Sequence, residues 1–421
     1  MIYTGENEIT NIMIGDTEIY GIYAGDLQIY PTDFGTLTGI TIEDLVWVED
    51  IPRTGGIATS GNCSFKVMAH YDSGKSRNVK SRSTITGSLV VPASTATTRE
   101  MVGTLTLTAD YEGFTDSDSV DVYQNPDFTT VPLTFEILSD GYINWKWNNN
   151  SSIAKTIQYS KNGDVWTSLT ASNSDTQIPV VAGDKVEFRG DNVKYGDVLD
   201  SPRYNYFNVT AQFNLYGNIM SLINSTDFAT LTQFQANSGQ NFVNFFANNA
   251  TLISAENLKL PAVDLHQQAY FAMFYNCTNL TKAPESVGTS ETRFTYTSTY
   301  NYVCRDMFRN CTSLVKAPAL PATVTRSTVY ENMFAGCTSL ETAPELPASS
   351  LASYCYQGMF NGCSNLKYIK CLATYGIDSA YSTNGWVSGV ASTGTFVKDQ
   401  NANWPTGNNG IPSGWTIIDA S

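Results

Sequence analysis

Residues 307–318 read MFRNCTSLVKAP, and the same pattern returns throughout the C-terminal half of the chain. Three further copies are plain: MFYNCTNLTKAP at 273–284, MFAGCTSLETAP at 333–344 and MFNGCSNLKYIK at 359–370. A fainter copy, FFANNATLISAE at 245–256, carries Asn249 where the others carry cysteine. Successive copies begin 28, 34, 26 and 26 residues apart. Repeats of this length predict a solenoid, in which each unit buries its apolar face only against its neighbours.

Each unit is expected to combine a short helix with a short strand. In the last copy, Ser350 can cap the helix, Gly362 can end it in a left-handed conformation, and a strand follows through Leu366. The apolar residues between Ser350 and Gly362 then fall near one helical face and stack on the next unit. The predicted repeat core consists of Met273, Phe274, Cys277, Leu280, Met307, Phe308, Cys311, Leu314, Met333, Phe334, Cys337, Leu340, Met359, Phe360, Cys363 and Leu366.

The repeated motif Met-Phe-x-x-Cys-Thr-x-Leu-x-x-Ala-Pro closely resembles the BspA-like leucine-rich repeats of gut Bacteroidetes. FNLYGNIMSLI at 213–223 looks like the N-terminal cap of such arrays, and residues 384–419 look like their C-terminal cap. The resemblance implies an α/β leucine-rich-repeat solenoid over residues 207–372, followed by a cap at 373–421.

Seven of the eight cysteines lie in the repeat region, and Cys277, Cys311, Cys337 and Cys363 share one repeat position. Metal binding would call for CxxC-type spacing, which is absent. Disulfides between neighbouring copies are conceivable, but parallel side-chain vectors disfavour their geometry. We therefore expect buried free thiols that act as small apolar residues.

Residues 34–126 read as short strands separated by turns, for example GSLVVPAS, TLTLTADYEG and SVDVYQN. Alternation of this kind without helical periodicity predicts an antiparallel sandwich. The stretch resembles the bacterial Ig-like domains called BACON, mainly through Val120 to Gln124. Asp116, Asp118 and Asp121 raise the alternative of a calcium site, but an exposed strand face explains their spacing more simply.

A second β-sandwich module is predicted over residues 129–206. YINWKWNNN reads as a strand, and IQYSKNGDVWTSL reads as a hairpin with its turn at 162–164. Trp145 and Trp147 are two residues apart, so they project from the same face. They are candidates for stacking on sugar rings, although a Trp more often fills a sandwich core. Trp166 is expected in that same core.

Residues 1–31 contain three tandem ten-residue units, each with the pattern of a small hairpin. Gly15-Asp16 and Gly25-Asp26 suit two-residue turns, and isoleucines alternate around them. Because a lone hairpin is marginal in water, these units call for a partner surface. They pack either on the next domain or, as an anchor, on another protein or another copy. The anchor candidates are Ile2, Ile12, Ile14, Ile19, Ile22 and Ile29.

Composition excludes several functional classes. The chain carries 24 basic and 39 acidic residues, a net charge of −15, without a basic stripe for nucleic acid. It lacks an apolar run long enough to cross a membrane, and its N-terminus lacks the pattern of a signal peptide. Only His70 and His266 occur, and His266 is expected to be exposed. Catalytic motifs are absent, so we expect no enzyme, cofactor or metal.

The expected whole is a multidomain, mainly β protein: hairpin repeats, two Ig-like sandwiches, then the capped solenoid. These modules occur together in bacterial surface adhesins and in fibres of crAss-like phages of Bacteroides-type hosts. The missing signal sequence favours a virion protein that assembles in host cytoplasm, a head fibre rather than a tail fibre. It is expected to be a homotrimer that contacts the capsid through its N-terminus. Glycans are the expected ligands, with Trp145, Trp147, Tyr296, Tyr300 and Tyr302 as candidate binding residues.

Overall fold

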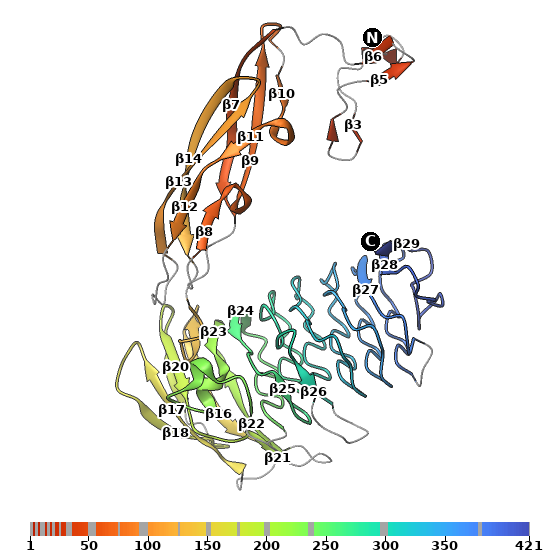
Figure 1. Ribbon diagram of the computed structural model, residues 1–421. Coiled ribbons are helices and arrows are strands. Elements are labelled where there is room, and N and C mark those ends of the chain that lie inside the picture. The colour runs from red at the N-terminus through yellow and green to blue at the C-terminus, as the bar shows by residue number, and fades with distance from the viewer. Residues whose placement is uncertain are drawn as a thin grey trace. The chain divides into compact units, whose positions relative to one another are not determined.

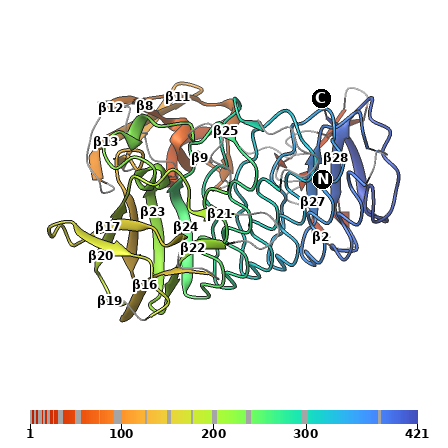
Figure 2. The same cartoon turned by 90° about the horizontal axis from the view of Figure 1, so that it is seen from below.

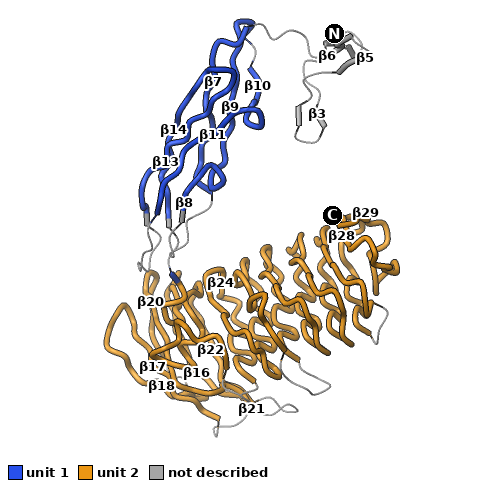
Figure 3. Tube along the Cα trace, viewed as in Figure 1, with its two compact units in different colours: residues 1–127 blue, residues 128–421 orange. Residues whose placement is uncertain are grey.

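The computed structural model is mainly β, with many separate sheets and almost no helix (Figure 1). It describes residues 3–4, 7–8, 13–14, 17–18, 22–24, 27–30, 36–48, 56–74, 76–91, 100–124, 127–148, 153–174, 177–197, 203–234, 240–294, 302–377 and 381–420. The chain forms two compact units, Met1–Asp127 and Phe128–Ser421 (Figure 3).

Three antiparallel hairpins occupy the N-terminal end of the first unit, as the ten-residue repeat predicts. Their strands are β1 (Tyr3–Thr4) with β2 (Asn7–Glu8), β3 (Met13–Ile14) with β4 (Thr17–Glu18), and β5 (Ile22–Ala24) with β6 (Leu27–Tyr30). Each hairpin is a separate two-stranded sheet. Of the anchor candidates, Ile14, Ile22 and Ile29 lie in these strands. Ile2, Ile12 and Ile19 lie outside the described residues.

The rest of the first unit is built from antiparallel strands in three sheets. The strand order of the first sheet is β10 (Ser76–Asn78)-β9 (Cys63–Tyr71)-β7 (Leu37–Trp47), and that of the second is β11 (Thr84–Thr86)-β13 (Glu100–Tyr111)-β14 (Phe114–Gln124). The third sheet pairs β12 (Ser88–Val91) with β8 (Gly56–Thr59). Two short 3-10 helices, η1 (Ser60–Asn62) and η2 (Lys80–Arg82), connect strands. Strand β9 alternates strictly, so Phe65, Val67 and Ala69 enter a core that Leu105 and Leu107 complete from β13.

The three aspartates of β14 accept hydrogen bonds from residues of β7, β13 and β14. Asp116 Oδ2 accepts a 2.7 Å hydrogen bond from the Ile42 N–H, which ties β14 to β7. Asp118 accepts from the Ser119 N–H, and Asp121 accepts from the Thr104 hydroxyl. No group of three or more metal-ligating side chains occurs among the residues that the structure describes. Each of these carboxylates thus accepts a hydrogen bond from the chain itself.

The second unit begins with two packed sheets. One has the order β18 (Thr167–Thr170)-β17 (Thr156–Lys161)-β20 (Lys185–Arg189)-β15 (Leu133–Ile137)-β23 (Phe213–Asn218)-β24 (Leu252–Lys259), and the other the order β19 (Gln177–Val180)-β16 (Gly141–Trp147)-β22 (Arg203–Val209)-β21 (Gly196–Asp197). The 3-10 helices η4 (Ile219–Leu222) and η5 (Phe228–Thr230) follow β23. β22 runs through the expected boundary at 206/207, so the chain does not divide there. β23 pairs with β24 in parallel and leads directly into the repeats.

The segments expected to be helices are runs of consecutive turns, so the predicted short helix is wrong. In the third full copy, the N–H groups of Asn332, Phe334 and Gly336 donate to carbonyls of the next copy. The N–H groups of the residues between them donate to carbonyls three positions earlier. Asn332 and Gly336 have φ values of 52° and 78°, a left-handed region that Asn and Gly tolerate. Gly362 is left-handed as predicted, but within such a run.

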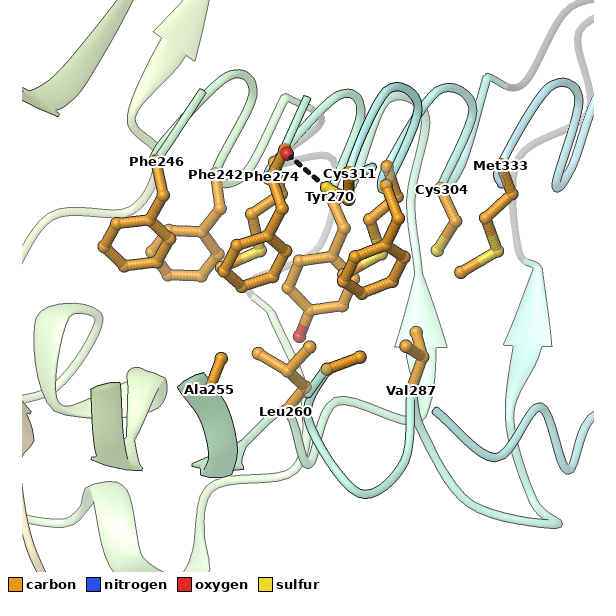
Figure 4. Packing of buried hydrophobic residues seen from close by; sticks show 14 of the residues in the cluster. Phe242, Phe246, Ala255, Leu260, Tyr270, Phe274, Val287, Cys304, Cys311 and Met333 are labelled. Carbon is orange, nitrogen blue, oxygen red and sulfur yellow. Dashed lines mark hydrogen bonds between the residues drawn. The ribbon is translucent and has the colours of Figure 1, made fainter. Parts of the chain in front are cut away.

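These turns stack into an array whose copies follow one another in register (Figure 2). All sixteen residues of the predicted repeat core are 0% exposed. A continuous column of phenylalanine rings, with centroids 5.2–5.7 Å apart, joins Phe246, Phe274, Phe308, Phe334 and Phe360. Figure 4 shows Phe246 and Phe274 of this column above Ala255, Leu260 and Val287 of the strand side. Short parallel pairings close that side, including β25 (Asp264–Leu265) with β26 (Arg293–Phe294).

Both ends of the array are capped within one continuous core. At the start, β22 takes the place of a preceding copy: Phe207 stacks on Phe246 at 5.9 Å and 11°. At the other end, Trp386 stacks on Trp404, and Trp386 Nε1 donates to the Gly410 carbonyl. A parallel sheet of β27 (Tyr368–Cys371), β28 (Thr395–Asp399) and β29 (Thr416–Ala420) ends the strand side.

Candidate binding surface

The structure separates the three tryptophans of the second β module. Trp145 is 1% exposed, and its Nε1 donates a 2.8 Å hydrogen bond to the Lys155 carbonyl. It packs against the rings of Tyr195, Phe207 and Phe245, so the core interpretation is confirmed and Trp145 is removed as a glycan-binding candidate. Trp147 is partly buried against the same core. Trp166 lies outside this core and is half-buried, with the Arg189 guanidinium carbon 4.0 Å from its ring centroid. The expectation that Trp166 is a core residue is therefore wrong.

Of the three tyrosine candidates in the insertion, Tyr296 and Tyr300 lie outside the described residues. Tyr302 is partly buried, with the Arg305 guanidinium 4.8 Å from its ring centroid. Its ring also meets Phe271 edge-on at 6.4 Å. Contacts on both the guanidinium and the phenyl side leave Tyr302 little free ring surface.

A compact ion cluster lies next to Tyr302. Arg305 pairs with Asp306 and Glu331 at 3.2 and 3.4 Å, and Arg309 pairs with Asp306 at 3.2 Å. The two carboxylate side chains are only 11% and 10% exposed. Burial raises the pKa of Glu331, although Arg305 works in the opposite direction. Since the arginines are already committed to carboxylates, the cluster links neighbouring copies and offers little to an anionic ligand.

A row of left-handed residues defines one edge of the array, which we call the edge column. Its members all have φ between 51° and 65°: Gln240, Gln268, Tyr302, Thr328, Tyr354 and Tyr381. Exposure varies along the column: Gln268 and Thr328 are buried, the other members before Tyr381 are partly buried, and Tyr381 is 62% exposed. The rings of Tyr354 and Tyr381 stack at 5.3 Å with an interplanar angle of 21°. Within the described residues, Tyr381 is the last member of the column.

Exposed hydroxyl-bearing residues lie on the segment that contains Tyr354 and on the segment that pairs with it. The segment that pairs with Ser350 contains Tyr375, which is 76% exposed. Ser349, Ser350 and Thr374 are exposed on the same two segments. We call Tyr354, Tyr375, Tyr381 and these neighbours the tyrosine edge. The sequence alone does not reveal the tyrosine edge, because its residues come together only through the pairing of the last segments of the array. The spacing of Tyr354 also suits an inward-facing position on a helix.

The strand side of the array carries paired charges instead. Glu256 accepts from both Lys282 and Lys316 at 2.7 Å, and Lys259 pairs with Glu285 at 2.9 Å. Burial of the Glu256 carboxyl opposes ionisation, but hydrogen bonds from the two lysines outweigh it and lower its pKa. Because each of these lysines pairs with a carboxylate of another copy, the ion pairs link neighbouring copies. This face is therefore not a patch of unpaired charge that would attract a ligand.

All eight cysteines are free and buried, and the four that share one repeat position form the expected column. Cys277, Cys311, Cys337 and Cys363 donate their S–H to the phenylalanine carbonyl of the preceding copy at 3.0–3.1 Å. Figure 4 marks this bond between Cys311 and Phe274. Burial raises the pKa of the Cys277 and Cys363 thiols to about 12, so they stay protonated at neutral pH. Because the thiolate is the nucleophile, these thiols are unsuited to nucleophilic chemistry.

Thiol titration checks this arrangement. We expect almost no reaction of the native protein with a water-soluble thiol reagent at pH 8, and eight thiols after denaturation. The folded pKa values exceed the unfolded value of 9.0, so the associated stability is complete below pH 9 and falls as the pH rises toward 12. A denatured protein with far fewer than eight reactive thiols would show that disulfides link the copies.

His266 is partly buried rather than exposed, and burial lowers its pKa. The expectation of an exposed histidine is therefore wrong. Among the residues that the structure describes, no helix is long and apolar enough to cross a membrane. Comparison with family models, with curated proteins and with solved structures finds no match to this chain.

Proposed function

We propose that this protein is a structural component of a bacteriophage particle, a head fibre held by its N-terminal hairpins. Its β modules and repeat array face outward for adhesion to host-surface or mucosal glycans. In this proposal the two β modules are Ig-like, the first of them BACON-like. The array is a BspA-like leucine-rich-repeat solenoid with consecutive turns in place of helices. A homotrimer on the virion surface is the expected assembly, by analogy with phage fibres.

The observation that carries the proposal is the isolation of the three hairpins. Among the described residues, none of their strands pairs with a strand of another sheet. A two-stranded hairpin is marginal in water, and its open edges are free to pair with other strands. Three such hairpins in series, with pairings Tyr3 to Glu8 and Met13 to Glu18 repeated ten residues apart, supply three equivalent docking elements. This arrangement suits attachment to a repetitive surface or to other copies of the chain.

The second unit has the properties of a display element. One hydrophobic core runs from the β module through every copy to the C-terminal cap. Repeats that share such a core resist bending locally, because each copy is held by its neighbours. The tyrosine edge lies on the last copies, far along the chain from the hairpins. A rigid element that carries an aromatic edge suits weak adhesion that many copies on one particle strengthen.

Deletion of residues 1–31 tests the anchoring role. Phage that produce the truncated chain are expected to lack the protein after purification, while the truncated protein keeps its thermal melt. A chain with residues 1–31 in scrambled order provides a control of equal length and composition. Truncated protein that still co-purifies with particles at normal copy number would contradict the anchor.

Antibody labelling separates the fibre from its main alternative, a bacterial cell-surface adhesin with the same modules. Under the proposal, gold label decorates intact virions and is absent from the envelope of uninfected cells. Label on uninfected cells, with none on virions, would overturn the phage assignment and favour the adhesin. Its position on head or tail would also test the preference for a head fibre.

A further inference from the structure

We infer that the tyrosine edge is the glycan-binding site and that it takes neutral sugar chains. The inference rests on the proposed adhesive function and gives it a location and a ligand class. It starts from the conformation of the edge column. A bulky residue at positive φ is uncommon and costs backbone strain, which is usually kept only where the site needs it.

Packing does not explain the tyrosines at the C-terminal end of the column. Tyr354 and Tyr381 adopt φ values of 59° and 62°, where Gly or Asn would be less strained. A ring that filled the core would offset that strain, but Tyr381 is 62% exposed. Tyr375, at 76% exposure on the neighbouring segment, also contributes no core. The chain thus presents the ring of Tyr381 to solvent at a positive φ that disfavours a large side chain, with the exposed ring of Tyr375 on a neighbouring segment.

The tyrosine edge has the chemistry of a carbohydrate site. Stacking of Tyr381 on Tyr354 fixes both rings, so a ligand loses little entropy in ordering them. Tyrosine offers rigid amphipathic contact area, while serine and threonine supply adaptable hydrogen bonds. Exposed Ser349, Ser350 and Thr374 provide such hydroxyls on the two paired segments that carry Tyr354 and Tyr375. A pyranose ring has a C–H face for the aromatic surface and hydroxyls for these groups.

Charge selects neutral sugars among the possible glycans. Residues 348–356 contain no charged residue, and residues 371–397, which include Tyr375 and Tyr381, contain Asp378 as their single charged residue and no arginine or lysine. Recognition of a carboxylate, sulfate or phosphate would call for an arginine or lysine at the site. The chain as a whole carries a net charge of −15, which repels polyanions before contact. A neutral chain of hexopyranose units is therefore the ligand that fits.

Affinity electrophoresis of the full chain tests the inference. Native gels contain neutral polysaccharides (dextran, laminarin or mannan) or anionic ones (polygalacturonate or dextran sulfate). We expect at least one neutral polysaccharide to retard the protein and the anionic ones to leave it unaffected. Tyr381→Gly removes the ring while suiting the left-handed backbone, and is expected to weaken retardation about tenfold. Tyr381→Phe keeps the stacking ring and most of the binding.

Tyr142→Ala is the matched control, since Tyr142 is 42% exposed on the β module, and it should bind as the parent does. Thermal melts confirm that all variants are folded. If a neutral polysaccharide retards Tyr381→Gly and Tyr375→Ala as strongly as it retards the parent protein, the protein binds glycans but the tyrosine edge is not the binding site. Retardation by anionic polysaccharides alone overturns the ligand class. Failure with every polysaccharide removes both this site and the adhesive role, while the anchoring role is judged separately by the hairpin deletion.

Discussion

Replacing Phe334 by alanine is expected to lower the free energy of unfolding of the second unit by about 3–5 kcal/mol. Phe334 is 0% exposed and lies between two parallel rings, Phe308 and Phe360, each 5.7 Å away. Truncation removes the apolar contact on both sides and leaves a cavity that neighbouring copies cannot fill without breaking their own stacking. The loss should appear in urea denaturation followed by circular dichroism.

The same variant should loosen the turns around it. The Phe334 N–H donates to the Met359 carbonyl and the Phe308 N–H to the Met333 carbonyl, so amide exchange should accelerate at both positions. Val315→Ala is the control, because Val315 lies in the same array but is 57% exposed. It should change stability by less than about 0.5 kcal/mol. An unfolding midpoint that Phe334→Ala leaves unchanged would mean that the ring column does not stabilise the array.

The ring column was predictable because it depends on a one-dimensional pattern. A residue that recurs once per copy, such as Phe308 and Phe334, must face its equivalent if the copies stack in register. The helix was not predictable by the same reasoning. Apolar residues at spacings of three and four suit an α-helix, but they equally suit turns that bond three positions back. Asn332 and Gly336, four residues apart, are the signal that distinguishes the two, since both favour positive φ.

The binding surface was less predictable than the core, for a different reason. Trp145 and Tyr381 are both aromatic residues in polar surroundings, and local pattern does not separate them. The rings of Tyr195 and Phe245 cover Trp145, whereas Tyr381 is the last member of the edge column among the described residues. Both outcomes depend on contacts between segments distant in sequence. Tyr375 likewise joins the surface only through the pairing of its backbone with Ser350.

The second large effect is expected at the junction between the β module and the first copy. Asn249 occupies the repeat position that holds cysteine elsewhere, and it is 2% exposed. Its Oδ1 accepts from the Val209 N–H at 2.8 Å. Its Nδ2 donates to the carbonyls of Phe207 and Phe246 at 2.8 and 2.9 Å. The cysteines of later copies donate their S–H to the phenylalanine carbonyl of the copy before them. Asparagine is thus suited to a junction where β22 presents both groups.

Asn249→Ala should therefore cost about 2–5 kcal/mol, since it leaves the Val209 N–H and at least one carbonyl buried without a partner. Asn249→Cys restores the residue of the other copies but supplies only the donor, so its loss should be smaller and still measurable. Asn249→Asp keeps the acceptor and places a carboxylate against two carbonyls. Its burial raises the carboxyl pKa, so its stability should recover as the pH falls and the acid becomes protonated. Urea denaturation at pH 7 and pH 4.5 measures all three variants against the parent. If Asn249→Cys is as stable as the parent, the Val209 hydrogen bond adds nothing to the stability of this junction.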